Sequence, residues 1–143
     1  MPSTLGAAVS ASASALSAER TRIEVAVSNL ANAESTRSAD GTPYRRRDVV
    51  LAPDRVNTFD RALGNAGATG VAVAAVVEDG APFRRRYEPS HPDADADGYV
   101  SLPNVDAPQE MVDMLGAARA YQANLAAITM IKDLITKSLE LGR

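Results

Sequence analysis

Apolar residues recur with helical spacing near the N-terminal end of the chain. Val9, Leu16, Ile23 and Leu30 follow one another at intervals of seven positions. This repeat places the four side chains on one narrow face of an α-helix. We therefore predict a helix over about residues 3–34. At 1.5 Å per residue it would be about 45 Å long, which exceeds the thickness of a small globule.

The C-terminal end has an alternating three-and-four spacing of apolar residues. The pattern begins at Met111 and is interrupted by Lys132. Asp106 is suited to be the helix N-cap, and Gln109 three positions later could complete a capping box. We predict a second helix over about residues 108–141.

The middle of the chain, residues 36–105, holds most of the Gly and Pro residues. Strands are expected at Tyr44–Leu51, at Val71–Val77 and at Phe83–Glu88, because these runs are rich in β-branched and aromatic residues or alternate in polarity. We expect the last two to pair as a β-hairpin across the connection Asp79-Gly80-Ala81-Pro82.

Two further stretches of the middle region are expected to lack regular structure. Asn57–Gly70 contains three glycines and is predicted to be a loose loop. His91–Asn104 is expected to be extended, because Pro92 and Pro103 cannot lie inside a helix or a central strand.

These elements predict an α+β fold. Its parts are an N-terminal helix in residues 1–35, a small β-rich insert in residues 36–105 and a C-terminal helix in residues 106–143. The insert is too small to bury both apolar stripes. We therefore expect the terminal helices to pair as a coiled-coil-like bundle, forming one inner domain, and to bury the remainder against other subunits.

The candidate subunit-interface residues lie on or beside the two stripes. Three of them are asparagines, whose side chains could bond across helices and fix their register, with ordinary polar flanking as the alternative. The full set is Leu16, Ile23, Val27, Asn29, Leu30, Asn32, Met111, Met114, Ala118, Tyr121, Asn124, Leu125, Ile128 and Ile135.

Charge and composition exclude several classes of protein. The net charge is −3, and the two basic runs, Arg45–Arg47 and Arg84–Arg86, fall on predicted strands. A nucleic-acid binder would show a basic excess. We therefore expect these arginines on exposed sheet faces or in salt bridges between subunits, and we expect no nucleic-acid partner.

Membrane and export signals are also missing from the sequence. No run of 18 apolar residues occurs, which argues against insertion in a membrane, and Met1–Gly6 lacks the features of a cleavable signal peptide. The protein is expected to stay in the cytoplasm or to leave it by a route without such a signal. The absence of cysteine excludes disulfides and thiolate chemistry.

One acidic motif suggests a different class of function. Asp93, Asp95 and Asp97 are spaced like the first ligands of an EF-hand, but Asn104 stands where the loop needs a bidentate Glu, and Pro103 blocks the exiting helix. We expect a solvated acidic turn or one facing a basic neighbour, and keep a calcium-binding adaptor as the alternative. No nucleophile–base pattern is present, so we expect neither an enzyme nor a cofactor.

The two ends resemble a known protein family. Residues 12–22 and 28–33 are similar to the N-terminal signature of the bacterial flagellar rod and hook proteins, and residues 110–124 are similar to their C-terminal signature. Within the family, residues 43–50 and 91–105 and the short length resemble the proximal rod proteins.

The resemblance implies a structural subunit that polymerises through its terminal helices into part of the proximal rod of the motor drive shaft. It implies helices packed as an inner tube with the β insert outside. The implied partners are further copies, other rod proteins, the flagellar type III export apparatus, and the inner-membrane ring and distal rod as neighbours. The implied location is the basal body in the periplasm. Within the family, the resemblance favours one particular protein of the proximal rod, and a different proximal rod protein is the alternative.

Overall fold

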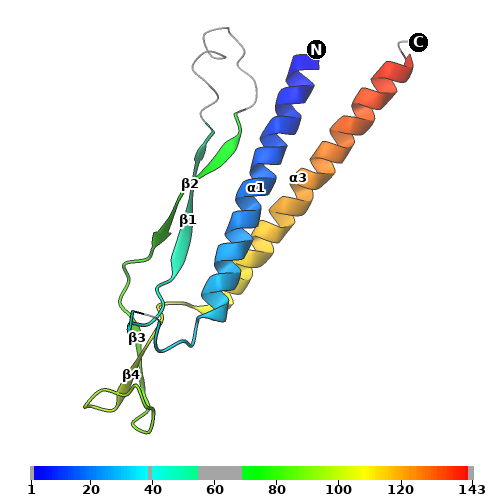
Figure 1. The fold of residues 1–143 in the computed structure, drawn as a ribbon. Helices are drawn as coiled ribbons and strands as arrows, with labels where there is room; N and C mark the ends of the chain where they lie inside the picture. Colours follow the sequence, from blue (N-terminus) through cyan, green and yellow to red (C-terminus); the bar gives the residue numbers. More distant parts are fainter. Residues whose placement is uncertain (1, 39, 55–68, 142–143) are drawn as a thin grey trace. The chain divides into compact units, whose positions relative to one another are not determined.

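The computed structural model describes residues 2–38, 40–54 and 69–141 (Figure 1). Two long helices flank a β-rich insert, so the predicted α+β fold is confirmed. The elements in chain order are α1 (Pro2–Ala31), β1 (Arg47–Pro53), β2 (Val71–Glu78), β3 (Arg84–Tyr87), β4 (Tyr99–Leu102) and α3 (Ala107–Leu141).

Both helices begin and end close to the predicted positions. α1 ends at Ala31 and continues into a turn, where the N–H of Ala33 donates to the carbonyl of Leu30 at 3.2 Å. At the start of α3, the N–H of Glu110 donates to the carbonyl of Asp106 at 3.0 Å. This first intrahelical bond places Asp106 at the N-cap, as predicted.

The strands form two separate two-stranded sheets, β1–β2 and β3–β4. In β1–β2, the N–H of Asp54 donates to the carbonyl of Gly70, and the N–H of Asp79 donates to that of Arg46, each at 2.8 Å. The end of β1 thus pairs with the start of β2, and the start of β1 pairs with the end of β2, which makes the sheet antiparallel. The predicted hairpin between Val71–Val77 and Phe83–Glu88 is therefore wrong.

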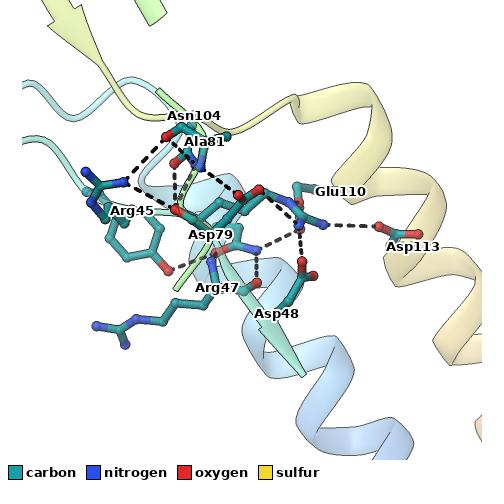
Figure 2. Close-up of polar contacts among 11 residues, drawn as sticks. Arg45, Arg47, Asp48, Asp79, Ala81, Asn104, Glu110 and Asp113 are labelled. Carbon is teal, nitrogen blue, oxygen red and sulfur yellow. Dashed lines mark hydrogen bonds and ion pairs between the residues drawn. The ribbon is translucent and has the colours of Figure 1, made fainter. Parts of the chain in front are cut away.

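The connection between β2 and β3 does not form a hairpin turn, because its carbonyl groups bind side chains instead. The carbonyls of Asp79 and Ala81 each accept hydrogen bonds from the side chains of Arg45 and Asn104, at 3.3 to 3.4 Å (Figure 2). Pro82, next in the chain, has no N–H to offer a ladder. The connection thus links two sheets.

The partner of β3 is β4, which lies inside the segment that was expected to be unpaired. The antiparallel register runs from Arg84 opposite Leu102 to Tyr87 opposite Tyr99. Pro103 follows immediately after the strand and is buried. The proline restricted the extent of β4 but did not prevent its pairing.

The chain divides into two compact units, and each takes segments from both helices and from the insert. Unit 1 comprises Met1–Thr21, Val50–Ala75 and Gly116–Arg143, and unit 2 comprises Arg22–Val49 and Val76–Leu115. The segments of the two helices thus pack together within each unit. The predicted loop 57–70 lies mostly outside the described residues.

The two units differ in what they bury. Among the described residues, the buried hydrophobic side chains of unit 1 are two alanines, Ala18 and Ala117. Unit 2 buries larger side chains, chiefly from β4 and the segment that follows it. Its buried residues are Ala26, Asn29, Ala33, Gly98, Val100, Leu102, Pro103, Val105 and Glu110.

Candidate functional site

The apolar stripe of α3 is largely exposed to solvent. Leu125 is 51% exposed and Leu139 is 70% exposed, and the same helix also exposes Met130 and Leu134. A shallow depression on this helix is lined by Gln122, Leu125, Ala126, Thr129, Met130 and Asp133. Burying such a face against another molecule would be favourable.

The predicted interface residues fall into three exposure groups. Asn29 is buried. Leu16, Ile23, Leu30, Asn32, Met114, Ala118, Tyr121, Asn124 and Ile128 are intermediate, and Val27, Met111, Leu125 and Ile135 are exposed. The predicted stripe did not include Ala126, Thr129, Met130 or Leu134, although Thr129 follows Leu125 by four positions and Met130 and Leu134 follow Ala126 at intervals of four, the spacing of one helix face.

The three predicted asparagines have different roles in the chain. The side-chain nitrogens of Asn32 and Asn124 donate to the carbonyls of Ser28 and Ala120, one turn back in their own helices. Asn29, by contrast, bonds across to the other helix. Its hydrogen-bonding groups are occupied within the chain.

Asn29 lies at the centre of a buried polar network in unit 2, and two of its partners, Arg47 and Glu110, are labelled in Figure 2. Its Nδ2 donates to the carbonyl of Arg47 at 2.8 Å and to Oε2 of Glu110 at 2.9 Å. Its Oδ1 accepts from the N–H of Arg47 and the hydroxyl of Tyr44, both at 2.9 Å. Two donors and two acceptor positions are all used, which fixes the orientation of the amide.

Glu110 is 2% exposed and carries its charge into this network. Its Oε1 accepts from Nε of Arg46 at 2.5 Å. The guanidinium of Arg46 also pairs with Asp48 and lies 3.9 Å from Asp79 and 3.7 Å from Asp113. The position of Glu110 in the first turn of α3 is favourable, because the helix dipole stabilises a negative charge there.

The charges around Arg46 alter its pKa. Burial alone would lower the pKa, but hydrogen bonds to Glu110 and Asp48, together with their negative charges, outweigh this effect and raise it. Within the described ranges, every buried side-chain nitrogen and oxygen has a hydrogen-bond partner. The network is therefore fully satisfied, as a stable buried polar cluster requires.

Sequence reasoning did not single out Glu110 or Arg46. In the sequence, Glu110 belongs to a family signature and Arg46 to a basic run. The available signal was an acidic residue in the first turn of a helix, next to the apolar stripe. Nothing local in the sequence identifies its partner, which lies 64 positions earlier.

The arginine runs form ion pairs and hydrogen bonds within the chain. In the second run, Arg85 pairs with Asp95 at 2.5 Å and Arg86 pairs with Glu34 at 2.8 Å. Of the first run, only Arg47 lies in a strand, at the start of β1. Arg46, Arg85 and Arg86 thus form intrachain pairs, and Arg84–Arg86 lie on an exposed strand, which agrees with the expected exposed sheet face.

The three aspartates of the acidic motif have separate surroundings. Asp93 accepts from the hydroxyl of Thr36 and pairs with Arg37, while Asp95 pairs with Arg85 and accepts backbone hydrogen bonds. Among the described residues, no group of three His, Cys, Asp or Glu side chains is placed to hold a metal ion. The motif forms an acidic turn facing basic neighbours.

Comparison with known proteins identifies the family. Residues 96–141 match the family described as flagellar basal body rod FlgEFG protein C-terminal. The chain is 47% identical over 130 residues to the flagellar basal-body rod protein FlgC of Salmonella typhimurium, an alignment that covers 91% of this chain and 92% of the relative. It is 43% identical to the FlgC of Bacillus subtilis (92% and 94% covered) and 38% identical to that of Borreliella burgdorferi (94% and 95%).

Nearly the full length of each relative is therefore matched, and the matched region includes both terminal helices and the insert. None of the helices in the described part of the chain is long and apolar enough to cross a membrane. The chain belongs to the FlgC family of flagellar basal-body rod proteins.

Proposed function

We propose that this protein is a structural subunit of the flagellar basal-body rod and that it polymerises through its terminal helices. The observation that carries the proposal is the 38–47% sequence identity, over nearly the full length, to the FlgC proteins of three bacteria. Their shared name describes a component of the rod. Family membership of this kind favours a structural role over the calcium-binding alternative.

The exposed stripe of α3 supports polymerisation as the mechanism. Leu125 and Leu139 are half-exposed or more in the single chain, Ile135 is 36% exposed, and the buried hydrophobic side chains in the described part of unit 1 are alanines. Burying one such side chain fully contributes about 1.5–3 kcal/mol relative to exposure. Several of them in each copy would supply the association energy of the rod, while the helices gain order from the same contacts.

The remaining partners follow from a rod role. The subunit would contact further copies of itself and other rod proteins, with the inner-membrane ring and the distal rod as neighbours. It would be exported by the flagellar type III apparatus without a cleavable signal peptide and assemble in the periplasm. A structural role of this kind needs neither a catalytic site nor a cofactor.

A complementation experiment tests the proposal. In the source bacterium with the chromosomal copy deleted, the unaltered gene should restore hook–basal bodies that can be counted by electron microscopy. Leu125→Asp should abolish them, because a charge would be buried in the assembled interface. Ile128→Asp should have the same effect.

Lys137→Asp is the matched control, since it places the same charge on an exposed position of the same helix that already carries a charged side chain outside the stripe. Rods should still form with this variant. Normal rods with both Leu125→Asp and Ile128→Asp would refute polymerisation through this face. Failure of the unaltered gene to restore basal bodies would refute the rod function itself.

A further inference from the structure

The buried face of α1 in unit 2 has one polar position next to an alanine. Its buried residues are Ala26 and Asn29, and the buried Ala33 lies in the turn that follows the helix. Ala26 lies about one helical turn before the asparagine. Small side chains allow two helices to pack closely. They select poorly among registers, however, because sliding one helix by a turn leaves similar alanine contacts.

The opposite helix places a single buried charge against this face. Glu110 bonds to Asn29 at 2.9 Å, so the last turn of α1 meets the first turn of α3. If α3 shifted by one turn towards the start of α1, the carboxylate would face Ala26, which cannot donate a side-chain hydrogen bond, and a shift the other way would carry it past the end of α1 at Ala31. A buried carboxylate without such partners is strongly disfavoured.

Arg46 makes the arrangement more selective. It reaches Glu110 from the segment before β1, and its own backbone N–H donates to Oδ1 of Asn104 at 2.9 Å. Asn29 is also held by the backbone of Arg47. The donors to Glu110 are therefore fixed by two independent parts of unit 2, and neither can follow a sliding helix.

We infer that Asn29, Glu110 and Arg46 are positioning residues that fix the register between α1 and α3. The inference rests on the proposed rod function, because a periodic assembly needs every copy to present its apolar faces with the same stagger. Buried ion pairs add little net stability, whereas a buried polar residue between helices can select one register. The network therefore acts on specificity more than on stability.

Distance measurements between spin labels test this directly. The natural chain has no cysteine, so labels can be attached only at introduced cysteines, for example at Ala31 on α1 and Val112 on α3, both exposed. The full-length labelled protein should show one narrow distance distribution. A broad distribution in this parent would overturn the inference, because the network would then not hold the helices together.

Glu110→Met should change the register without unfolding the helices. Arg46 keeps Asp48, Asp79 and Asp113 as partners, and Asn29 keeps Arg47. We expect unchanged helix content by circular dichroism, but a second population displaced by about 5.4 Å, one helical turn. A single unchanged distance in this folded variant would overturn the inference.

Two control variants separate register from charge. Glu110→Gln has the same length and retains an acceptor for Asn29, so it should keep one distance. Arg85→Met removes an ion pair of similar length, 2.5 Å, at an exposed site in the same unit, and should also leave the distance unchanged. If both controls showed a second, displaced population in the distance distribution between the spin labels, a specific role for the buried network would be contradicted.

If Glu110→Met does not fold, a relocated amide provides the test. The double variant Asn29→Ala/Ala26→Asn moves the polar position by about one turn along α1 and should move the main distance with it. An unchanged distance would overturn the inference. The rod function is tested separately, because the unaltered gene restores basal bodies or fails to do so regardless of what these variants show.

Discussion

The hydroxyl of Ser14 on α1 accepts a hydrogen bond at 3.0 Å from the N–H of Val71, the first residue of β2. The same hydroxyl donates to the carbonyl of Ala11 at 2.8 Å. A Cβ added to Gly70 would lie 2.7 Å from this oxygen. One serine thus attaches the start of the strand to the helix, and glycine provides the space for it.

Ser14→Ala should destabilise unit 1 by about 1 kcal/mol, because the N–H of Val71 loses its partner at a partly buried site. Gly70→Ala should cost about 1–3 kcal/mol through steric overlap with the serine oxygen. The two effects should be less than additive in the double variant, since removing the oxygen relieves the overlap. Denaturant unfolding of the four proteins measures this, and strict additivity would show that the two residues do not interact.

Protonation of Asp95 should weaken the β3–β4 hairpin at low pH. A backbone hydrogen bond from Tyr99, then the pairing with Arg85 and a bond from the N–H of Asp97, outweigh partial burial and lower its pKa. A lowered carboxyl pKa stabilises the fold above the unfolded-state value of about 3.9, and this stabilisation is lost as the pH falls through the folded-state value.

The stability difference between wild type and Asp95→Asn should therefore shrink as the pH falls from about 5 towards 2. Thermal unfolding followed at several pH values gives this difference directly. A difference that stays constant with pH would mean that the Asp95 carboxylate contributes nothing through its charge.

Gly98 is required by the turn that leads into β4. Its φ is +81°, and an added Cβ would lie 2.9 Å from Cε2 of Tyr87 and 3.1 Å from Cβ of Pro89. Gly98→Ala should cost at least about 1–2 kcal/mol from backbone strain alone, plus displacement of the tyrosine ring. Gly80→Ala, where nothing lies within 4 Å, is the matched control and should be nearly neutral by thermal unfolding.

Hydrogen exchange should distinguish the two units in the unassembled protein. Unit 2 buries Val100, Leu102 and Val105, whereas α3 beyond Leu125 consists of exposed or intermediate residues. Amides of α3 beyond Leu125 should therefore exchange faster than those of β4, because local opening there exposes little additional apolar surface. Assembly into rods should slow exchange in α3, and equal protection of both regions before assembly would contradict this prediction.

The terminal helices could be predicted because helix formation leaves a local, periodic pattern. The repeat from Val9 to Leu30 located α1, and Asp106 marked the start of α3. The strands β2 and β3 were also located within a few residues. Strand pairing was not predictable in the same way, because the turn residues Asp79–Pro82 are equally compatible with a hairpin and with a link between sheets.

Local patterns along the chain were enough to locate the two helices and the β-rich insert between them, and the signatures were enough to indicate the resemblance to rod proteins. The pairing of β1 with β2 and of β3 with β4, and the burial of Glu110 against Asn29 and Arg46, became visible only in the folded chain. The physical reason is the range of the interactions. Helical periodicity is written into neighbours three and four positions apart, whereas Asn29 and Glu110 are 81 positions apart and meet only when the chain has folded.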